Sequence, residues 1–391
     1  MKKKIMLIVP MLHQGGFERV CVATARLLEP FFDVYIIMFD SKDIAYDIKG
    51  LNVIDLHMGV KMDMAGKVFN VLKRSYAVRR LKKKLAIDIA YSFGPTANVV
   101  NIFSRRKERV WIGIRSYMDM ENGQKIRLFC KMSDKVLCCS QMIEDEIKAK
   151  YNCKKAITLY NPLDVEEIQK KADAEQPRLP WENKNHIIVS MGREDDVKGY
   201  WHLIKSFALV RKDIPDAKLM IIGEGDFEEY RNLAKQLGIA DHIYFPGMKK
   251  NPFPYLKAAE VYVLSSYHEG FPNALLEAMA LGIPVIATDC MTGPGEILQK
   301  RYISDRQEAA EGAGKVVYGD YGVLIANMSP EKDLDAQLIT EEEKRLSGEI
   351  RRMMTDSGHY EHYKKAACMR AGDFSNKAYV EILKKQIEIN G

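Results

Sequence analysis

Short apolar runs alternate with amphipathic helical stretches along nearly the whole chain, and this alternation restricts the fold more than any other feature. Helical patterns lie at residues 18–28, 66–85 and 141–150, each between two apolar runs. Strands separated by helices pair in parallel, because each helix carries the chain back across the sheet. The strands expected in the first half are 5–9, 34–38, 52–55, 87–91, 110–114, 135–138 and 156–159.

A polar stretch at residues 165–185, interrupted by Pro177 and Pro180, is expected to link two domains. A second series of strands and helices follows it. Helices are expected at 200–212, 227–236 and 272–280, and the tail from about 341 to 389 also has a helical pattern. The strands expected in this second series are 186–190, 218–222, 242–245, 261–264, 284–287 and 322–325.

The length of 391 residues fits two domains that each bury a core. We predict an α/β protein with two Rossmann-like, doubly wound domains at 1–165 and 166–373, and a C-terminal helix at about 374–391 that packs back on the first. Ligands of such sheets bind outside the carboxyl ends of the strands. A central cleft between the two domains is therefore the expected active site.

Composition excludes several classes of protein. The seven cysteines form no C-x-x-C pair, so neither a disulfide scaffold nor a structural metal site is expected. No apolar run approaches the roughly 18 residues that span a bilayer. The start resembles a short signal peptide but lacks a small-residue cleavage site, so we interpret residues 4–9 as a buried strand of a cytoplasmic protein.

Charge is divided unevenly between the two halves. Residues 1–165 contain 29 Lys and Arg against 17 Asp and Glu, a net charge of +12, so the remainder carries −6 of the total of +6. A basic first half is typical of partners such as nucleic acid, an anionic membrane surface or a phosphorylated substrate. No nucleic-acid-binding motif is present, and nucleic acid is therefore not expected as a partner.

The helix expected at 67–84 concentrates this basic charge and leaves two interpretations open. Either its basic residues form a solvated face above a packed apolar stripe, or they dock on an anionic membrane at the cytoplasmic side. Its basic residues are Lys73, Arg74, Arg79, Arg80, Lys82, Lys83 and Lys84, and its apolar residues are Val68, Phe69, Val71, Leu72, Val78 and Leu81.

The strongest functional signal lies between residues 265 and 298. An apolar strand ends in a polar loop, and a helix is expected to start at Pro272, where the fixed φ of proline suits the first helical position. Phe271 is a poor cap, so the backbone N–H groups of this helix are expected to face an anionic ligand. Glu269 in the loop and Glu277 in the helix are good acceptors for sugar hydroxyls.

In the run 269–280, EGFPNALLEAMA, followed by GIPVI at 282–286, the chain resembles the retaining glycosyltransferases of family 4, and more specifically the bacterial members that assemble polysaccharides. The resemblance implies a GT-B fold and a hexosyltransferase that uses a nucleotide-diphosphate sugar, here a UDP-sugar. It implies no metal and no other cofactor. The expected acceptor is a saccharide, lipid-linked and destined for a cell-surface polysaccharide or glycoconjugate.

Two further segments match motifs of this family. The first is SMGREDDVKG at 190–199, where Gly192 lies beside the expected diphosphate and Arg193 and Lys198 stabilise the charge that builds on it. Three adjacent acids, at 194–196, either point to solvent or weaken that binding. The second is HQGGFER at 13–19, where the backbone of Gly15 and Gly16 is expected to face the diphosphate.

Smaller features complete the predicted site. Gly223 follows a strand and is expected to line the nucleotide pocket, and the resemblance places the base near Met248. The donor sugar is expected against Glu269 and the backbone from Gly270 to Asn273, with Glu277 on the ribose. Residues 292–297 either approach the diphosphate or form a simple turn.

The first domain departs from the family in one respect. Many members carry a histidine near the transferred sugar, where this chain has GIRSY at 113–117. Arg115 there, and His13 after the first strand, are the candidates to contact the acceptor or the sugar. His268 also flanks the expected cleft, although a lone histidine is more often structural.

No residue of these motifs is identified as a covalent nucleophile. The resemblance therefore implies attack by the acceptor hydroxyl on the same face as the departing phosphate. Because a fold does not determine a function, two alternatives remain open: a nucleotide-sugar epimerase, or a nucleotide-sugar-binding protein without catalytic activity.

Overall fold

The computed structural model of the chain describes residues 2–13, 15–42, 44–59, 64–300 and 316–389. Backbone contacts divide the chain into two compact units. Unit 1 consists of Met1–Pro162 and Asn376–Gly391, and unit 2 consists of Leu163–Ser375. The boundaries expected at 165 and 373 lie within three residues of these divisions.

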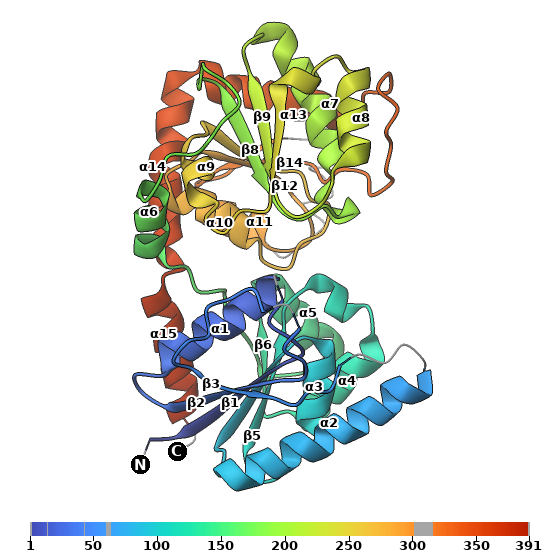
Figure 1. Ribbon diagram of the computed structural model, residues 1–391, viewed down its shortest axis with the longest axis vertical. Coiled ribbons are helices and arrows are strands. Elements are labelled where there is room, and N and C mark those ends of the chain that lie inside the picture. Colours follow the sequence, from blue (N-terminus) through green and yellow to red (C-terminus); the bar gives the residue numbers. More distant parts are fainter. Residues whose placement is uncertain (1, 14, 43, 60–63, 301–315, 390–391) are drawn as a thin grey trace. The chain divides into compact units, whose positions relative to one another are not determined.

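The sheet of unit 1 is parallel and doubly wound (Figure 1). Its strand order is β3-β2-β1-β4-β5-β6-β7, so the chain winds outward in both directions from β1 and β4. Ile5 of β1 pairs with Val34 of β2 on one side and Ile89 of β4 on the other. The strands are β1 (Lys4–Val9), β2 (Asp33–Met38), β3 (Asn52–Asp55), β4 (Ile89–Phe93), β5 (Arg109–Ile114), β6 (Lys135–Cys138) and β7 (Ala156–Thr158).

Helices cover both faces of this sheet. Alternate residues of β1 point to opposite faces, and since the residues on both faces are apolar, each face is buried under helices. Ile5, Leu7 and Val9 pack in one core with α1 and α15, whereas Met6 and Ile8 pack in another with α2 and α3. The helices of unit 1 are α1 (Gly16–Leu28), α2 (Met64–Leu85), α3 (Pro95–Phe103), α4 (Gly123–Met132), α5 (Gln141–Tyr151) and α15 (Asn376–Glu388).

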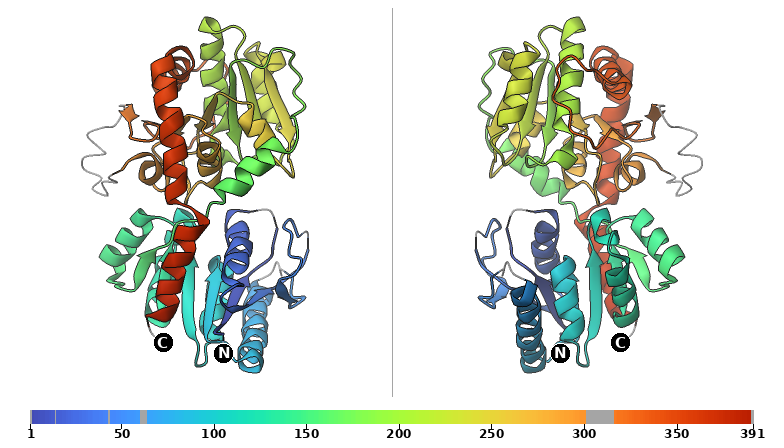
Figure 2. Two further views of the ribbon diagram at one scale, coloured as in Figure 1. Left: turned by 90° about the vertical axis from the view of Figure 1, so that its left-hand side faces the viewer. Right: turned by 90° about the vertical axis from the view of Figure 1, so that its right-hand side faces the viewer.

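The C-terminal helix α15 belongs to unit 1, although the whole of unit 2 lies between it and the rest of unit 1 in the sequence (Figure 2). The hydroxyls of Tyr379 and Thr24 lie 2.6 Å apart in the core shared with α1. Leu383 and Ile387 are buried in the same core. These contacts make the C-terminal helix part of the hydrophobic core of unit 1.

Unit 2 repeats the doubly wound plan. Its sheet has the order β10-β9-β8-β11-β12-β14-β13, in which the edge strand β13 is antiparallel and was not expected from the sequence. The predicted α/β class, with two Rossmann-like doubly wound domains, is thus confirmed. The strands are β8 (Ile187–Met191), β9 (Lys218–Ile222), β10 (Ile243–Gly247), β11 (Val261–Leu264), β12 (Val285–Thr288), β13 (Val317–Tyr318) and β14 (Val323–Ile325).

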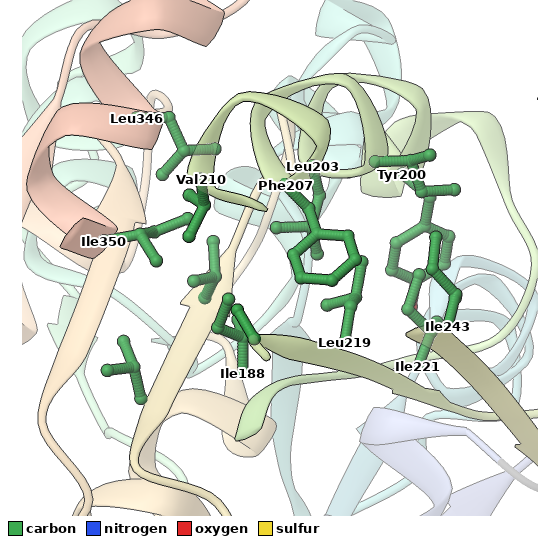
Figure 3. Close-up of a cluster of buried hydrophobic side chains, with 14 of the residues drawn as sticks. Ile188, Tyr200, Leu203, Phe207, Val210, Leu219, Ile221, Ile243, Leu346 and Ile350 are labelled. Atoms are coloured by element: carbon green, nitrogen blue, oxygen red, sulfur yellow. The ribbon is translucent and has the colours of Figure 1, made fainter. Parts of the chain in front are cut away.

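Figure 3 shows the core between this sheet and the helices of one face. Phe207 of α7 and Leu346 of α13 are fully buried against strand residues such as Ile188 and Leu219. The helices of unit 2 are α6 (Val165–Asp173), α7 (Tyr200–Asp213), α8 (Glu228–Gln236), α9 (Phe253–Lys257), α10 (Asn273–Ala280), α11 (Pro294–Leu298), α13 (Glu341–Thr355) and α14 (Ser357–Asp373).

Two local expectations were wrong. Residues 165–173 are not linker but α6, which Asp164 caps and whose Ile168 and Ala172 are buried. Pro272 is the cap of α10 rather than its first residue, because its ψ of 97° is extended. The helical pattern expected for the C-terminal tail is observed as three helices, because Asp356 and Phe374 interrupt it with non-helical backbone.

The packing predicts a specific cost for filling the space at Gly223. A Cβ at this position would fall well inside van der Waals contact with the Gly192 carbonyl oxygen, and backbone cannot move aside as a flexible side chain can. We expect Gly223→Ala to lower the free energy of unfolding by about 1–3 kcal/mol. The measurement is the midpoint temperature of thermal unfolding, which should fall accordingly. Gly372→Ala is the matched control, since no described atom lies within 4 Å of a Cβ there. Equal midpoints for the two variants would contradict this packing.

Candidate functional site

The loops that carry the predicted residues of unit 2 meet at the carboxyl edge of its sheet. The strand order reverses between β8 and β11, and ligands of doubly wound folds bind at this switch point. Backbone hydrogen bonds join the loops: Glu194 N–H donates to the Glu224 carbonyl at 2.7 Å, and Tyr267 N–H donates to the Val197 carbonyl at 3.0 Å. The edge is therefore one connected surface rather than a set of separate loops.

An ion pair between Lys198 and Glu269 lies at the centre of this surface. The Lys198 Nζ is 2.7 Å from the Glu269 Oε1, and the two side chains are 21% and 12% exposed. Ser265 Oγ donates to the Lys198 carbonyl at 2.8 Å. Gly199 has a φ of 58°, and any Cβ there would overlap the Ser265 carbonyl oxygen. The structure thus brings together two predicted catalytic residues and fixes the loops that carry them.

Arg193 is held more loosely. Its side chain is 65% exposed and approaches the Asp195 carboxylate at 3.4 Å. Exposed pairs of this kind contribute little to stability, so the guanidinium can leave Asp195 for a ligand at small cost. The other two acids of this loop are engaged elsewhere: Glu194 accepts the N–H of Phe227 at 2.8 Å, and Asp196 lies 2.9 Å from Lys332.

The segment from Glu269 to Pro272 is supported by the loop that follows β12. The Thr292 hydroxyl donates to the Glu269 carbonyl. Gly293 has a φ of 93°, and a Cβ there would lie 2.5 Å from Pro272 Cδ. Pro272, the N-cap residue of α10, makes no side-chain cap hydrogen bond, and the positive end of the helix dipole lies at this N-terminus. Residues 292–297 therefore form a turn into α11 and also support the Glu269 loop.

Two buried residues, Glu277 and Tyr262, also belong to this part of unit 2. Glu277 projects from α10 and is only 2% exposed. Burial, and then the carboxylates of Glu269 and Glu277, raise the pKa of the Tyr262 hydroxyl, which keeps it protonated. Sequence reasoning missed Tyr262 because it occupies an ordinary apolar position of β11. Ser265 and Thr292 were missed as supports because they act on loops distant in sequence.

The residues expected near the nucleotide line the same edge. Gly192 follows β8, and its carbonyl accepts a 2.9 Å hydrogen bond from the Tyr200 hydroxyl. Gly223 follows β9 and lies against Gly192. Met248 follows β10 and is 53% exposed, which offers an apolar side chain to a flat ring.

The glycine loop of unit 1 is tied to a tyrosine. Gly15 N–H donates to the Tyr46 Oη at 2.9 Å, and the Tyr46 hydroxyl donates to the Gly15 carbonyl at 2.7 Å. The Gly15 N–H is thus used within the unit, whereas Gly16, the first residue of α1, is exposed. His13 is half-buried, and Gln14 lies outside the described residues.

Arg115 is buried rather than presented at the surface. Its residue is 9% exposed, Nη1 donates to Asn161 Oδ1 at 3.1 Å, and Nη2 donates to the Tyr91 hydroxyl. The guanidinium carbon lies 5.2 Å from the ring centroid of Phe93. Arg115 is therefore a fixed cation at the carboxyl end of β5, positioned by aromatic neighbours.

Metal ligands are not clustered in the part of the chain that the structure describes: no group of three or more His, Cys, Asp and Glu side chains there could hold a metal ion. The cations of the unit 2 edge are side chains, Lys198 and Arg193.

Comparison with known proteins agrees with this architecture. The family described as "Glycosyl transferases group 1" matches residues 171–312. An uncharacterized glycosyltransferase of Methanocaldococcus jannaschii is 31% identical over 348 residues, which cover 82% of this chain and 84% of that protein. The crystal structure of Anabaena HepE in complex with UDP superposes with a TM-score of 0.73 at 16% identity, covering 98% and 99% of the two chains.

A second relative has a known reaction. The N-acetylgalactosamine-N,N'-diacetylbacillosaminyl-diphospho-undecaprenol 4-alpha-N-acetylgalactosaminyltransferase of Campylobacter jejuni is 28% identical over 314 residues, 75% of this chain and 83% of that protein.

The support from Thr292 leads to a testable expectation. Thr292→Val keeps the shape of the side chain but removes the hydroxyl that holds the Glu269 carbonyl, so the loop loses about 1 kcal/mol of stabilisation. We expect faster amide hydrogen exchange across residues 265–273, measured by mass spectrometry. Thr355→Val, at an exposed helix end, is the control. Unchanged exchange in Thr292→Val would show that the hydroxyl does not hold the loop.

Proposed function

The chain belongs to the group 1 glycosyltransferases, and on that premise we propose that it is a retaining, metal-independent hexosyltransferase of family 4. It transfers a sugar from a UDP-sugar to a lipid-linked saccharide. UDP is the nucleotide bound by Anabaena HepE. A diphospho-undecaprenol acceptor is part of the name of the Campylobacter relative. The proposed place of the reaction is the cytoplasmic face of the membrane.

The observation that carries the proposal is the Lys198–Glu269 ion pair at the switch point of unit 2. A carboxylate that accepts hydrogen bonds from sugar hydroxyls stands there beside a cation that attracts phosphate. Lys198 and the loosely held Arg193 stabilise the negative charge that grows on the leaving diphosphate. No metal is needed in this scheme, because two side-chain cations carry that charge.

The remaining residues hold the donor. Glu269 and the backbone from Gly270 and Phe271 through Pro272 to Asn273 contact the sugar, at the N-terminal end of α10. Glu277 accepts from the ribose hydroxyls. The uridine lies near Met248, with Gly192 and Gly223 along its phosphates. In unit 1, Gly16 faces the diphosphate, and its neighbour Gly15 is held in place by Tyr46. His13 orients the acceptor or the sugar, and the buried Arg115, bonded to Asn161 and Tyr91, contributes a fixed positive charge.

The proposed reaction exchanges one bond for another. The bond between the anomeric carbon and the β-phosphate oxygen breaks, and the acceptor hydroxyl oxygen forms the new bond on the same face. The hydroxyl proton passes to the departing phosphate oxygen. Lys198 and Arg193 then hold UDP, and configuration at the anomeric carbon is retained.

An assay of donor specificity tests the proposed reaction directly. The full chain is incubated with UDP-, GDP- and ADP-sugars, with and without EDTA, and nucleotide release and binding are measured. We expect release of UDP alone, with equal rates in the presence and absence of chelator. Binding without turnover even when saccharide acceptors are supplied would favour a binding protein, and turnover abolished by EDTA would refute metal independence.

The two cations are tested by substitution. Arg193→Ala and Lys198→Ala each remove charge that stabilises the transition state, so we expect kcat to fall about 100-fold or more. Lys257→Ala removes a cation whose partner is Asp173, on the surface of unit 2, and serves as the control. Full turnover of Arg193→Ala would refute its role in carrying the diphosphate.

A further inference from the structure

Helix α2 of unit 1 presents apolar side chains to solvent. Val68 is 59% exposed, Phe69 62%, Leu72 63% and Tyr76 65%. Side chains one turn apart lie on one side of a helix, so these four form a continuous stripe over its first half. The interpretation of these residues as a packed stripe is therefore wrong for Val68, Phe69 and Leu72, whereas Val78 is fully buried.

The second half of the same side is basic. Arg79, Arg80, Lys83 and Lys84 are exposed, and steps of about 100° per residue place them over the sector that Val68 to Tyr76 occupy. The guanidinium carbon of Arg80 lies 6.0 Å from the ring centroid of Tyr76, where the two halves meet. No Asp or Glu occurs between residues 64 and 85. We call these eight exposed residues the α2 face.

The opposite side of α2 is firmly attached to unit 1. The Lys82 Nζ is 2.8 Å from the Glu108 Oε1 and 2.8 Å from the Asn101 Oδ1, with both ionic side chains almost fully buried. Arg74 donates to the carbonyls of Met58 and Gly59. The orientation of the α2 face is therefore set by buried contacts, and its exposure is not a loss of packing.

The basic region continues beyond the helix. Arg79 donates to the carbonyl of Arg105, next to the C-terminus of α3. Phe103 at that end of α3 is 53% exposed, and Arg106 and Lys107 follow it. The surface around the end of α2 thus repeats the combination of an exposed apolar ring and basic side chains. In Figure 1, α2 is the long blue helix on the outer side of unit 1, next to α3.

We propose that the α2 face docks unit 1 on an anionic lipid bilayer. Phe69 and Leu72 enter the boundary between headgroups and acyl chains, while Arg79 and Lys83 contact anionic headgroups. Four exposed apolar residues in line distinguish this face from a nucleic-acid surface, and an all-basic second half opposes pairing with a second copy of itself. Among the described helices, none is long and apolar enough to cross a membrane. The inference rests on the proposed lipid-linked acceptor and names the surface that approaches it.

Vesicle sedimentation of the full chain tests the proposal without donor or acceptor. Vesicles contain phosphatidylcholine alone or mixed with phosphatidylglycerol. We expect binding to the mixed vesicles only, weakened by salt. F69S/L72S lowers the partition coefficient about tenfold or more, and R79Q/R80Q lowers it about fivefold for each cation removed. The controls are M369S and K212Q/K235Q, which alter exposed residues of unit 2 and are expected to bind like the wild type.

Three results would overturn the proposal: equal recovery on neutral and anionic vesicles, wild-type binding by both α2 variants, or a dimer in solution that F69S/L72S abolishes. Thermal midpoints equal to that of the wild type confirm that the variants are folded. UDP release with a short, soluble saccharide acceptor separates the two proposals. If docking fails but UDP release persists, only the α2 face is wrong; if vesicle binding persists without any UDP release, the proposed reaction is wrong.

Discussion

The Lys198–Glu269 ion pair depends on how closely the loops after β8 and β11 approach. The two residues are separated by 71 positions in the chain, and their charged atoms come within 2.7 Å. That approach requires a glycine at 199, where a side chain would overlap the Ser265 carbonyl, and it is secured by the Ser265 hydroxyl. The loop after β12 supports the same segment through Thr292. The chemistry of the edge therefore rests on backbone packing.

Charge in the chain is used in two different ways. Some ionic groups bind partners within their own unit: Lys82 pairs with Glu108, and Glu194 accepts a backbone N–H at the start of α8. Others are presented outward, as Arg193 is, with only a weak partner in Asp195. A count of basic residues does not separate these uses. The net charge of the first half indicated an anionic partner, but within α2 only the exposed subset of the basic residues is available to meet one.

Much of the fold was predictable because its strands are buried on both faces. Such strands are largely apolar runs, and the expected strands at 135–138, 218–222 and 261–264 match the observed bounds. Short polar helices were harder. Residues 165–173 carry so many charges that they resemble a linker, yet burial of Ile168 and Ala172 is enough to order α6 once unit 2 forms around them. In the site, the motif residues were found from local patterns, whereas Tyr262, Ser265 and Thr292 support them from positions without a motif.

The sequence by itself determined the alternation of strands and helices, and hence two doubly wound sheets whose switch points collect loops. It also determined which side chains those loops carry, since Lys198 and Glu269 lie in the loops that follow the buried strands β8 and β11. Tertiary structure alone decided which charges meet and which apolar residues stay exposed. The reason is that α2 has apolar residues on more than one side, so its periodicity is compatible with several orientations. The buried contacts of Arg74, Val78 and Lys82 select one of them and leave Phe69 and Leu72 in solvent.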